Sequence, residues 1–279
     1  MKRLLYIELQ KLWLNRASKV LVLSYFILLS FIALLASVNF KFLGIDFRLA
    51  DQGIFNFPYI WHFNTYIADV FKLFLALVIV SMIANEYTYG TLKQNLIDGL
   101  SKKEMLQSKL LTVALLSVAS TLFLFVMTLI LGYSFSSYNE TSIVFTDVSY
   151  MLYYLLKLFF FFTFCLFAGI LIKRSAFAVG FVIMWYVAEF IIFLVLRWKI
   201  ILDAEQTDKI MGFFPMFSNM NLLKEPFSRF QAVKAIETAQ AGAVTQKFYG
   251  VHWYEIAIAL FWTAFFMLMS YRILKKRDL

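Results

Sequence analysis

Long, nearly unbroken runs of apolar residues alternate with short polar stretches along this chain. Six runs are about 20 residues long, the length that an α-helix needs to cross the hydrocarbon core of a bilayer. They are residues 20–40, 66–84, 110–133, 150–172, 176–196 and 254–274. The pattern predicts an all-α integral membrane protein with six transmembrane helices in a single domain, residues 1–279.

The first 16 residues follow a different pattern. Leu5, Leu9, Leu12 and Trp13 recur at helical spacing among basic residues. A basic helix with leucine and tryptophan on one side is typical of a segment that lies in the membrane interface. We therefore expect an N-terminal interfacial helix, with a frayed extension of the first span as the alternative. The first apolar run exceeds the roughly 7–15 residues of a signal-peptide core, so no cleavable signal is predicted.

Composition and charge agree with a membrane protein. The chain is 62% hydrophobic and 15% charged, whereas soluble domains have about 45–50% and about 25%. The net charge of +9 would suggest a nucleic-acid partner in a soluble protein. Here, a cytoplasmic N-terminus places 15 Lys and Arg inside and 2 in the short outside loops. Because basic residues favour cytoplasmic loops, we expect a multi-pass plasma-membrane protein in the lipid bilayer, with both termini cytoplasmic and no nucleic-acid partner.

Residues 197–253 form the predicted external segment. Ser228 and Gln231 have the spacing of a capping box, and Gly242 is a suitable stop, so a short helix is expected over residues 229–241. Upstream, residues 212–217 are apolar and include a proline. They either dip into the outer leaflet, covered by protein or a water-filled cavity, or pack as a loop on the bundle.

Charged residues within the spans are costly in lipid and often functional. Lys157 and Glu189 lie about 10 Å below the outer ends of their spans, so we hypothesise that they form an intramembrane polar pair. Replacing Lys157 alone should then destabilise more than replacing both. Asp69 and Lys72 are expected to pair locally, with Lys72 reaching outward. A structural role is favoured for all four, and the alternative is that Glu189 lines a translocation path.

The polar segment of residues 85–109, between the second and third spans, carries strong local signals. Gly90 predicts a break, and Gly99 is a natural helix stop. Ser101 and Glu104 have the spacing of a capping box that opens the next helix. The sequence therefore predicts a short helix between two spans.

This short helix has an apolar face. Leu92 and Leu96 lie on it, next to Ile97, and we expect all three to face the cytoplasm. An exposed apolar patch of this kind suggests a docking site for a partner. The alternative is that the patch folds back onto the interior of the chain.

The same segment resembles the corresponding loop in permease subunits of type-2 ABC transporters. The shared pattern is Glu86, then Gly90-Thr91-Leu92-Lys93, then Gly99-Leu100-Ser101-Lys102-Lys103-Glu104, then Lys109-Leu110-Leu111. Lys102 stands where that family often has arginine. The resemblance extends to six spans, cytoplasmic termini, an interfacial helix and a long outside segment before the last span.

The resemblance implies that the 85–104 loop is a coupling helix for a separate ATP-binding-cassette ATPase subunit. The partner-binding residues would be Glu86, Gly90, Thr91, Leu92 and Lys93, joined by Leu96 from the apolar patch. A second permease copy, identical or paralogous, would complete an exporter whose translocation path lies between the two permeases. ATP and Mg would bind the partner subunit, and this chain would bind no cofactor.

Chemistry within the chain itself is sparse. It has no G-x-x-x-x-G-K-[ST] phosphate loop, so it is not expected to hydrolyse ATP alone. His62 and His252 have no Cys or His neighbours in sequence, so no metal site is expected, and Cys165 is expected to be a small core residue. No catalytic residue is predicted. The alternatives are a membrane-embedded enzyme, or a scaffold or sensor that does not transport; no residue in the spans identifies a cargo.

Overall fold

The structure, a computed structural model, describes residues 2–37, 39–42, 45–48, 54–199, 203–229 and 248–277. Within them, five helices are long and apolar enough to cross a membrane. They are α3 (Tyr59–Thr88), α5 (Lys102–Phe135), α7 (Ser149–Ile172) with the preceding turn, α8 (Ser175–Leu194) with its continuation to Trp198, and α12 (Trp253–Lys276). A sixth candidate arises if Lys2–Leu14 and Arg16–Phe31, which meet at 90°, count as one span. The structure thus supports a membrane-embedded helical protein.

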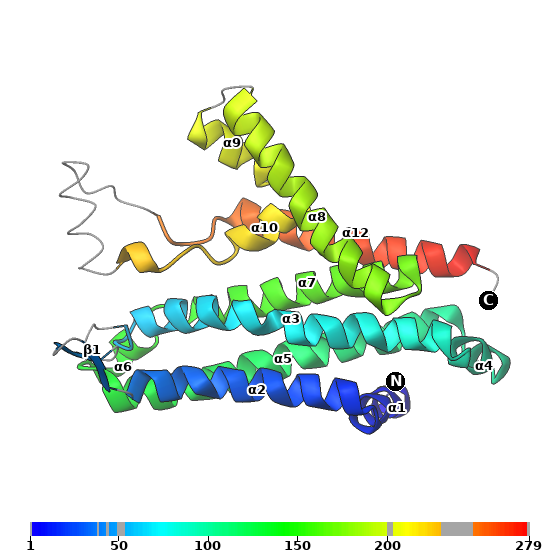
Figure 1. Cartoon of the computed structure of the whole chain (residues 1–279), viewed down its shortest axis with the longest axis horizontal. Helices are drawn as coiled ribbons and strands as arrows, with labels where there is room; N and C mark the ends of the chain where they lie inside the picture. Colours follow the sequence, from blue (N-terminus) through cyan, green and yellow to red (C-terminus); the bar gives the residue numbers. More distant parts are fainter. Residues whose placement is uncertain are drawn as a thin grey trace.

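α7 is the central helix of the bundle, and it packs against α3, α5, α8 and α12 (Figure 1). Of the residues in its most apolar 18-residue stretch, 72% are buried. α7 is apolar on all sides, and a helix of that kind suits a position in the core. Phe164 of α7 packs on Phe266 of α12, with ring centroids 4.9 Å apart. α2 (Arg16–Ser37) packs along α3 on the side away from α12.

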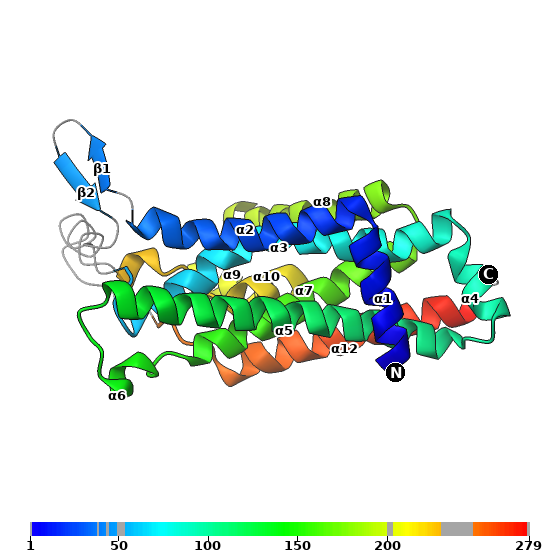
Figure 2. The same cartoon turned by 90° about the horizontal axis from the view of Figure 1, so that it is seen from below.

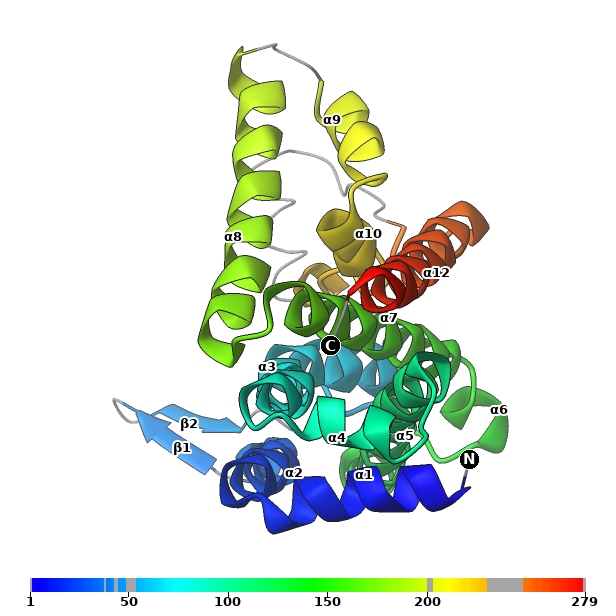
Figure 3. The same ribbon diagram turned by 90° about the vertical axis from the view of Figure 1, so that its right-hand side faces the viewer.

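α8 diverges from the bundle. It starts beside the end of α7 after a two-residue turn at Lys173 and Arg174, then tilts away (Figure 3). Only 11% of its most apolar 18-residue stretch is buried. A π-helical turn, Val195–Lys199, continues it. An apolar helix with so little protein cover requires lipid or another protein along most of its length.

The two ends of the molecule differ. Both chain termini lie at the end that carries α4 (Thr91–Ile97) (Figure 1). α1 (Lys2–Leu14) crosses that end almost perpendicular to α2 (Figure 2). The opposite end carries α6 (Thr141–Val144) and a two-stranded hairpin. The termini therefore share one end, as predicted.

The hairpin corrects the predicted limit of the first span, which ran to residue 40. α2 ends at Ser37, and β1 (Asn39–Phe42) pairs antiparallel with β2 (Ile45–Arg48), so that Phe40 lies opposite Phe47. Apolar and polar residues alternate in both strands, which is the period of a strand rather than of a helix.

The segment between α8 and α12 enters the bundle. α9 (Ala204–Met211) is followed by Gly212 and by α10 (Pro215–Asn221), which packs against α7, α8 and α12. Proline at the first position of α10 suits a helix start. Pro215, Met216, Ser218 and Asn219 of α10 are buried beside three candidate spans, so this part of the segment is a helix packed within the bundle rather than a loop on top of it. The predicted helix over 229–241 lies almost wholly outside the described residues; Ser228 lies in the 3-10 turn Phe227–Arg229.

Candidate functional site

The 85–109 segment consists of one short helix between two glycine bends. Gly90, with φ of +67°, precedes α4, and Gly99, with φ of +95°, follows it. The Glu104 amide donates to Ser101 Oγ over 3.2 Å, and the Ser101 amide donates to the Glu104 carboxylate over 3.0 Å. The predicted breaks, short helix and capping box are therefore confirmed.

The side chains of α4 divide into an outward and an inward set. Thr91 and Lys93 are exposed, Ile97 is 68% exposed and Leu96 is half-buried. Leu92 is only 2% exposed, so the prediction that it faces solvent is wrong.

Leu92 instead belongs to the same buried apolar cluster as Met105 and Leu106 of α5. Full burial of a leucine side chain stabilises by about 1.5–3 kcal/mol. Leu92 therefore holds α4 against the bundle, and the predicted fold-back of the patch is correct for this residue.

Four charged side chains form a cluster beside this segment; Glu8, Glu86 and Lys109 are buried, and Lys11 lies at the edge with 38% of its side chain exposed. Lys109 Nζ lies 2.6 Å from Glu86 Oε1 and 2.5 Å from Glu8 Oε2. Lys11 Nζ lies 2.8 Å from Glu86 Oε1 and 3.2 Å from Glu8 Oε1. Two carboxylates and two ammonium groups make the cluster neutral, which a buried site requires. We call these four residues the ion cluster; it joins α1, α3 and α5.

The ion cluster changes the role expected for Glu86. Its side chain is buried and paired, so it positions the segment rather than presenting a carboxylate to a partner. Sequence reasoning missed Glu8 and Lys11, although Glu8 is the one acidic residue among the first 45. Burial would lower the pKa of Lys11, but its hydrogen bond to Glu86 and the charges of Glu86 and Glu8 raise it.

A small hollow of about 200 Å³ adjoins the ion cluster between α1 and α3. Lys11, Asn15, Asn85, Glu86 and Tyr89 are among the residues that line it. Among the described residues, no donor reaches the buried Glu86 Oε2. The hollow thus combines amide and carboxylate acceptors with one lysine.

Arg277 ties the far end of α12 to the same region. Its guanidinium donates to the carbonyl oxygens of Ile170 and, over 2.8 Å, Leu171. Lys102 Nζ donates to the Arg277 carbonyl over 2.6 Å. The last carbonyls of a helix lack intrahelical donors, so Arg277 caps α7 while its own backbone holds the start of α5.

The predicted pair of Lys157 and Glu189 does not form. Lys157 Nζ lies 3.2 Å from Asp69 Oδ2, and Lys72 Nζ lies 2.9 Å from the same oxygen. The pairing of Asp69 with Lys72 is confirmed, but Lys72 is buried and donates to Asn219 Oδ1 over 3.3 Å, so its predicted outward reach is wrong. Equal depth in two spans did not mean that the side chains face each other.

Glu189 instead holds the start of α10. Its carboxylate accepts from the Met216 amide over 3.0 Å, from the Phe217 amide over 3.1 Å and from Trp185 Nε1 over 2.6 Å. The first amides of a helix lack intrahelical acceptors, and a carboxylate there is stabilising. At the other end of α10, Asn219 Nδ2 donates to the Lys157 carbonyl over 2.9 Å.

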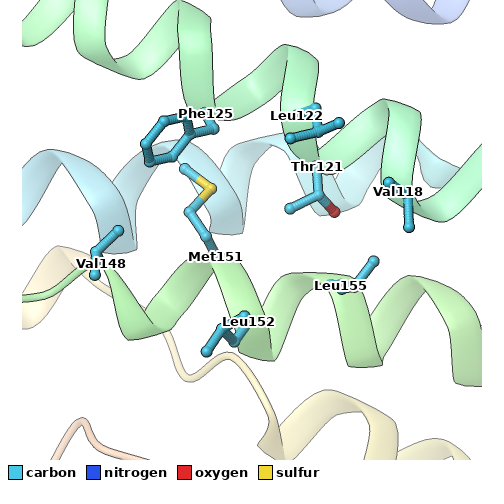
Figure 4. Close-up of a pocket in the computed structure, with 8 residues that line it drawn as sticks. All are labelled: Val118, Thr121, Leu122, Phe125, Val148, Met151, Leu152 and Leu155. Carbon is cyan, nitrogen blue, oxygen red and sulfur yellow. The ribbon is translucent and has the colours of Figure 1, made fainter.

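An apolar groove of about 390 Å³ runs between α5 and α7 (Figure 4). Figure 4 shows Met151 extending from α7 toward Phe125 of α5, beside Leu122 and Thr121. The Thr121 hydroxyl donates to the Ser117 carbonyl over 2.9 Å. The one lining hydroxyl has thus already used its donor, all other lining side chains are apolar, and the groove suits hydrocarbon rather than a polar ligand.

The histidines have structural partners. His62 Nε2 lies 2.8 Å from the Lys224 carbonyl, and Arg229 Nη1 lies 3.1 Å from its Nδ1. The His252 amide donates to Glu255 at the start of α12. Within the described residues, no three His, Cys, Asp or Glu side chains gather as a metal ion would need, and Cys165 is buried.

Comparison with known proteins identifies a family for this chain, but no activity is known for that family. No curated protein matches this chain. A family model described as "Protein of unknown function (DUF2705)" matches residues 56–279, which include α3 to α12 and leave out α1 and α2. The chain belongs to this family of proteins of unknown function, DUF2705.

Proposed function

We propose that this chain is the membrane-spanning permease subunit of an ATP-driven exporter in the plasma membrane. In this proposal α2 is the first of six spans, the α4 end faces the cytoplasm, and the 85–104 loop docks on a separate ATP-binding-cassette ATPase. The partner holds ATP and Mg, and a second permease copy completes the translocation path.

The observation that carries the proposal is that α4 has an exposed face and is held firmly against the ends of α3 and α5. It lies at the end of two long helices, α3 and α5 (Figure 1). Leu92 anchors it from within, and the ion cluster fixes α3, α5 and α1 at its base. A helix that must pass force from a soluble motor to membrane spans needs an exposed face and a rigid base, and α4 has both.

The divergence of α8 supports a second copy. Most of its apolar surface lacks cover within the chain. The buried carboxylate of Glu189 lies on this helix and is shielded by α10. A path between two permeases would place the least covered span at the interface.

The test is affinity purification of the chain in mild detergent from its native membrane, with identification of the proteins that come with it. The variant to compare carries Lys93→Glu and Ile97→Asp, because both side chains are exposed on α4. Leu92 is unsuitable, since a buried aspartate there would disrupt the fold. The control carries Lys209→Glu on α9 and Tyr138→Asp beside α6, two exposed positions in parts of the molecule far from α4.

We expect an ATP-binding-cassette subunit to accompany the native chain and the control, and its recovery with the α4 variant to fall at least tenfold. Loss from both variants would remove α4 as the docking element. If crosslinked native chain yields no ATPase, the exporter proposal fails, and a scaffold, a sensor or a membrane-embedded enzyme takes its place.

A further inference from the structure

α1 has an inward face and an outward face of different chemistry. Glu8 and Leu12 are buried on the inward face, toward α5 and α3. The outward face carries exposed Tyr6 and Trp13. Figures 2 and 3 show α1 at the edge of the bundle, across the end of α2 and beneath α5, with no other described helix or strand on its outer side.

The charges on the two faces are also different. The ion cluster neutralises Glu8 and Lys11 within the protein. Four basic residues remain in and just after α1: Lys2, Arg3, Arg16 and Lys19. No carboxylate of the described part of the chain pairs with any of them within ion-pair distance. These cations lie at the two ends of α1, Lys2 and Arg3 at its start and Arg16 and Lys19 just beyond its end, and together they attract an anionic surface.

The aromatic residues indicate at which level of a bilayer this surface would lie. Lys19 Nζ stands 4.7 Å above the Trp13 ring, and Leu14 beside it is 80% exposed. Tryptophan and tyrosine favour the headgroup level of a bilayer, and basic residues of an interfacial helix reach the phosphates. The 90° angle between α1 and α2 sets the axis of α1 parallel to the membrane plane if α2 crosses the membrane along its normal.

We propose that the outward face of α1 binds anionic lipid headgroups, and that this contact holds the ion cluster in place. The basic residues pair with headgroup phosphates, and Trp13 and Leu14 enter the boundary of the acyl chains. Since Glu8 and Lys11 project from the opposite face into the ion cluster, lipid at α1 stabilises the base of α4. This inference requires the membrane but no ATPase, so it can hold or fail separately from the exporter proposal.

The first test is a lipid titration of the purified full chain in a neutral detergent, followed by native mass spectrometry. Phosphatidylglycerol is the anionic probe and phosphatidylcholine the zwitterionic one. One variant carries Lys2→Gln, Arg3→Gln and Arg16→Gln. The control variant carries Arg272→Gln, Lys275→Gln and Lys276→Gln, which removes three charges that are also exposed, at the same end of the molecule.

Each cation near an anionic surface contributes about fivefold to affinity at moderate salt. We expect the α1 variant to bind its tightest phosphatidylglycerol at least tenfold more weakly than the control variant does. We also expect added salt to weaken binding to the native chain. Equal losses in both variants, or equal binding of the two lipids by the native chain, would overturn the proposal.

A second test locates the face itself. Trp13 fluorescence is isolated as the difference between the native chain and a Trp13→Phe variant in phosphatidylglycerol vesicles that contain brominated lipid. We expect the bromines nearest the headgroups to quench this difference signal most strongly. A signal that no bromine quenches would place Trp13 in water or against a protein, and the lipid assignment would be wrong.

Discussion

Lys109 shows how one side chain can join three helices. Its ammonium group, on α5, donates to Glu86 on α3 and to Glu8 on α1, and it is fully buried. Removing one member of a buried ion pair leaves its partner charged and unpaired, which costs more than the pair itself contributes.

We therefore expect Lys109→Ala to destabilise the protein by about 3–5 kcal/mol. The change leaves Glu8 and Glu86 facing each other with Lys11 as their sole cation within the ion cluster. The measurement is the midpoint of thermal unfolding in detergent. Lys103→Ala, at an exposed lysine of the same helix, is the control and should shift stability by no more than about 0.5 kcal/mol. Similar midpoints for the two variants would show that the ion cluster contributes little.

At this scale the sequence indicates which residues are unusual but not which ones meet. Lys157 and Glu189 were recognised as costly within a span, and their similar depths suggested a pair. Depth follows from the position along a helix, whereas contact also depends on how each helix is rotated. Asp69 on α3 is turned toward Lys157, and Glu189 is turned toward α10.

α10 is the element that links these two buried sites. Its first amides bind Glu189 of α8, and its Asn219 contacts Lys72 and the backbone of Lys157. Trp262 of α12 donates to the Phe213 carbonyl just before it. A seven-residue helix has little stability of its own, so α10 keeps its place through these contacts.

Double-mutant cycles distinguish the observed pairing from the predicted one. We expect Lys157→Met and Asp69→Asn to be coupled by about 0.5–3 kcal/mol, because the two side chains touch. Lys157→Met and Glu189→Gln should be additive within about 0.5 kcal/mol. Thermal unfolding of the single and double variants gives both numbers. Stronger coupling of Lys157 to Glu189 than to Asp69 would restore the original hypothesis.

The sequence predicted elements well where local chemistry decides them. Each of the long apolar runs begins in a helix, and all but the first stay helical to their ends; Gly90, Gly99 and the pair of Ser101 with Glu104 mark the limits of α4 and α5 correctly. The exposure of Leu92 was mispredicted because helical spacing shows which residues share a face but not where that face points. The change from α2 to β1 was missed because the apolar run continues from one into the other.

At the scale of the whole molecule, a contact between distant parts of the chain holds one end of the helical bundle together. Arg277 caps α7, while its carbonyl accepts from Lys102 at the start of α5. These hydrogen bonds fix the positions of α12, α7 and α5 relative to one another at the end of the molecule that carries α4.

We expect Arg277→Ala to destabilise the protein by about 1–3 kcal/mol, since it removes charged donors from carbonyls at the end of α7. The loss should appear first as faster hydrogen exchange at that end of α7 and α12. Arg272→Ala, an exposed arginine one turn earlier on α12, is the control and should leave exchange unchanged. Equal exchange in the two variants would show that the cap is dispensable.

This contact also has a consequence for the order of assembly. Leu171 and Arg277 are 106 residues apart, so α7 leaves the ribosome well before the residue that caps it. Until α12 has been synthesised and inserted, the last carbonyl groups of α7 remain uncapped at the α4 end of the newly made bundle. A quality-control protease or chaperone that recognises unfinished chains would find exposed backbone there, and the signal would disappear when Arg277 docks.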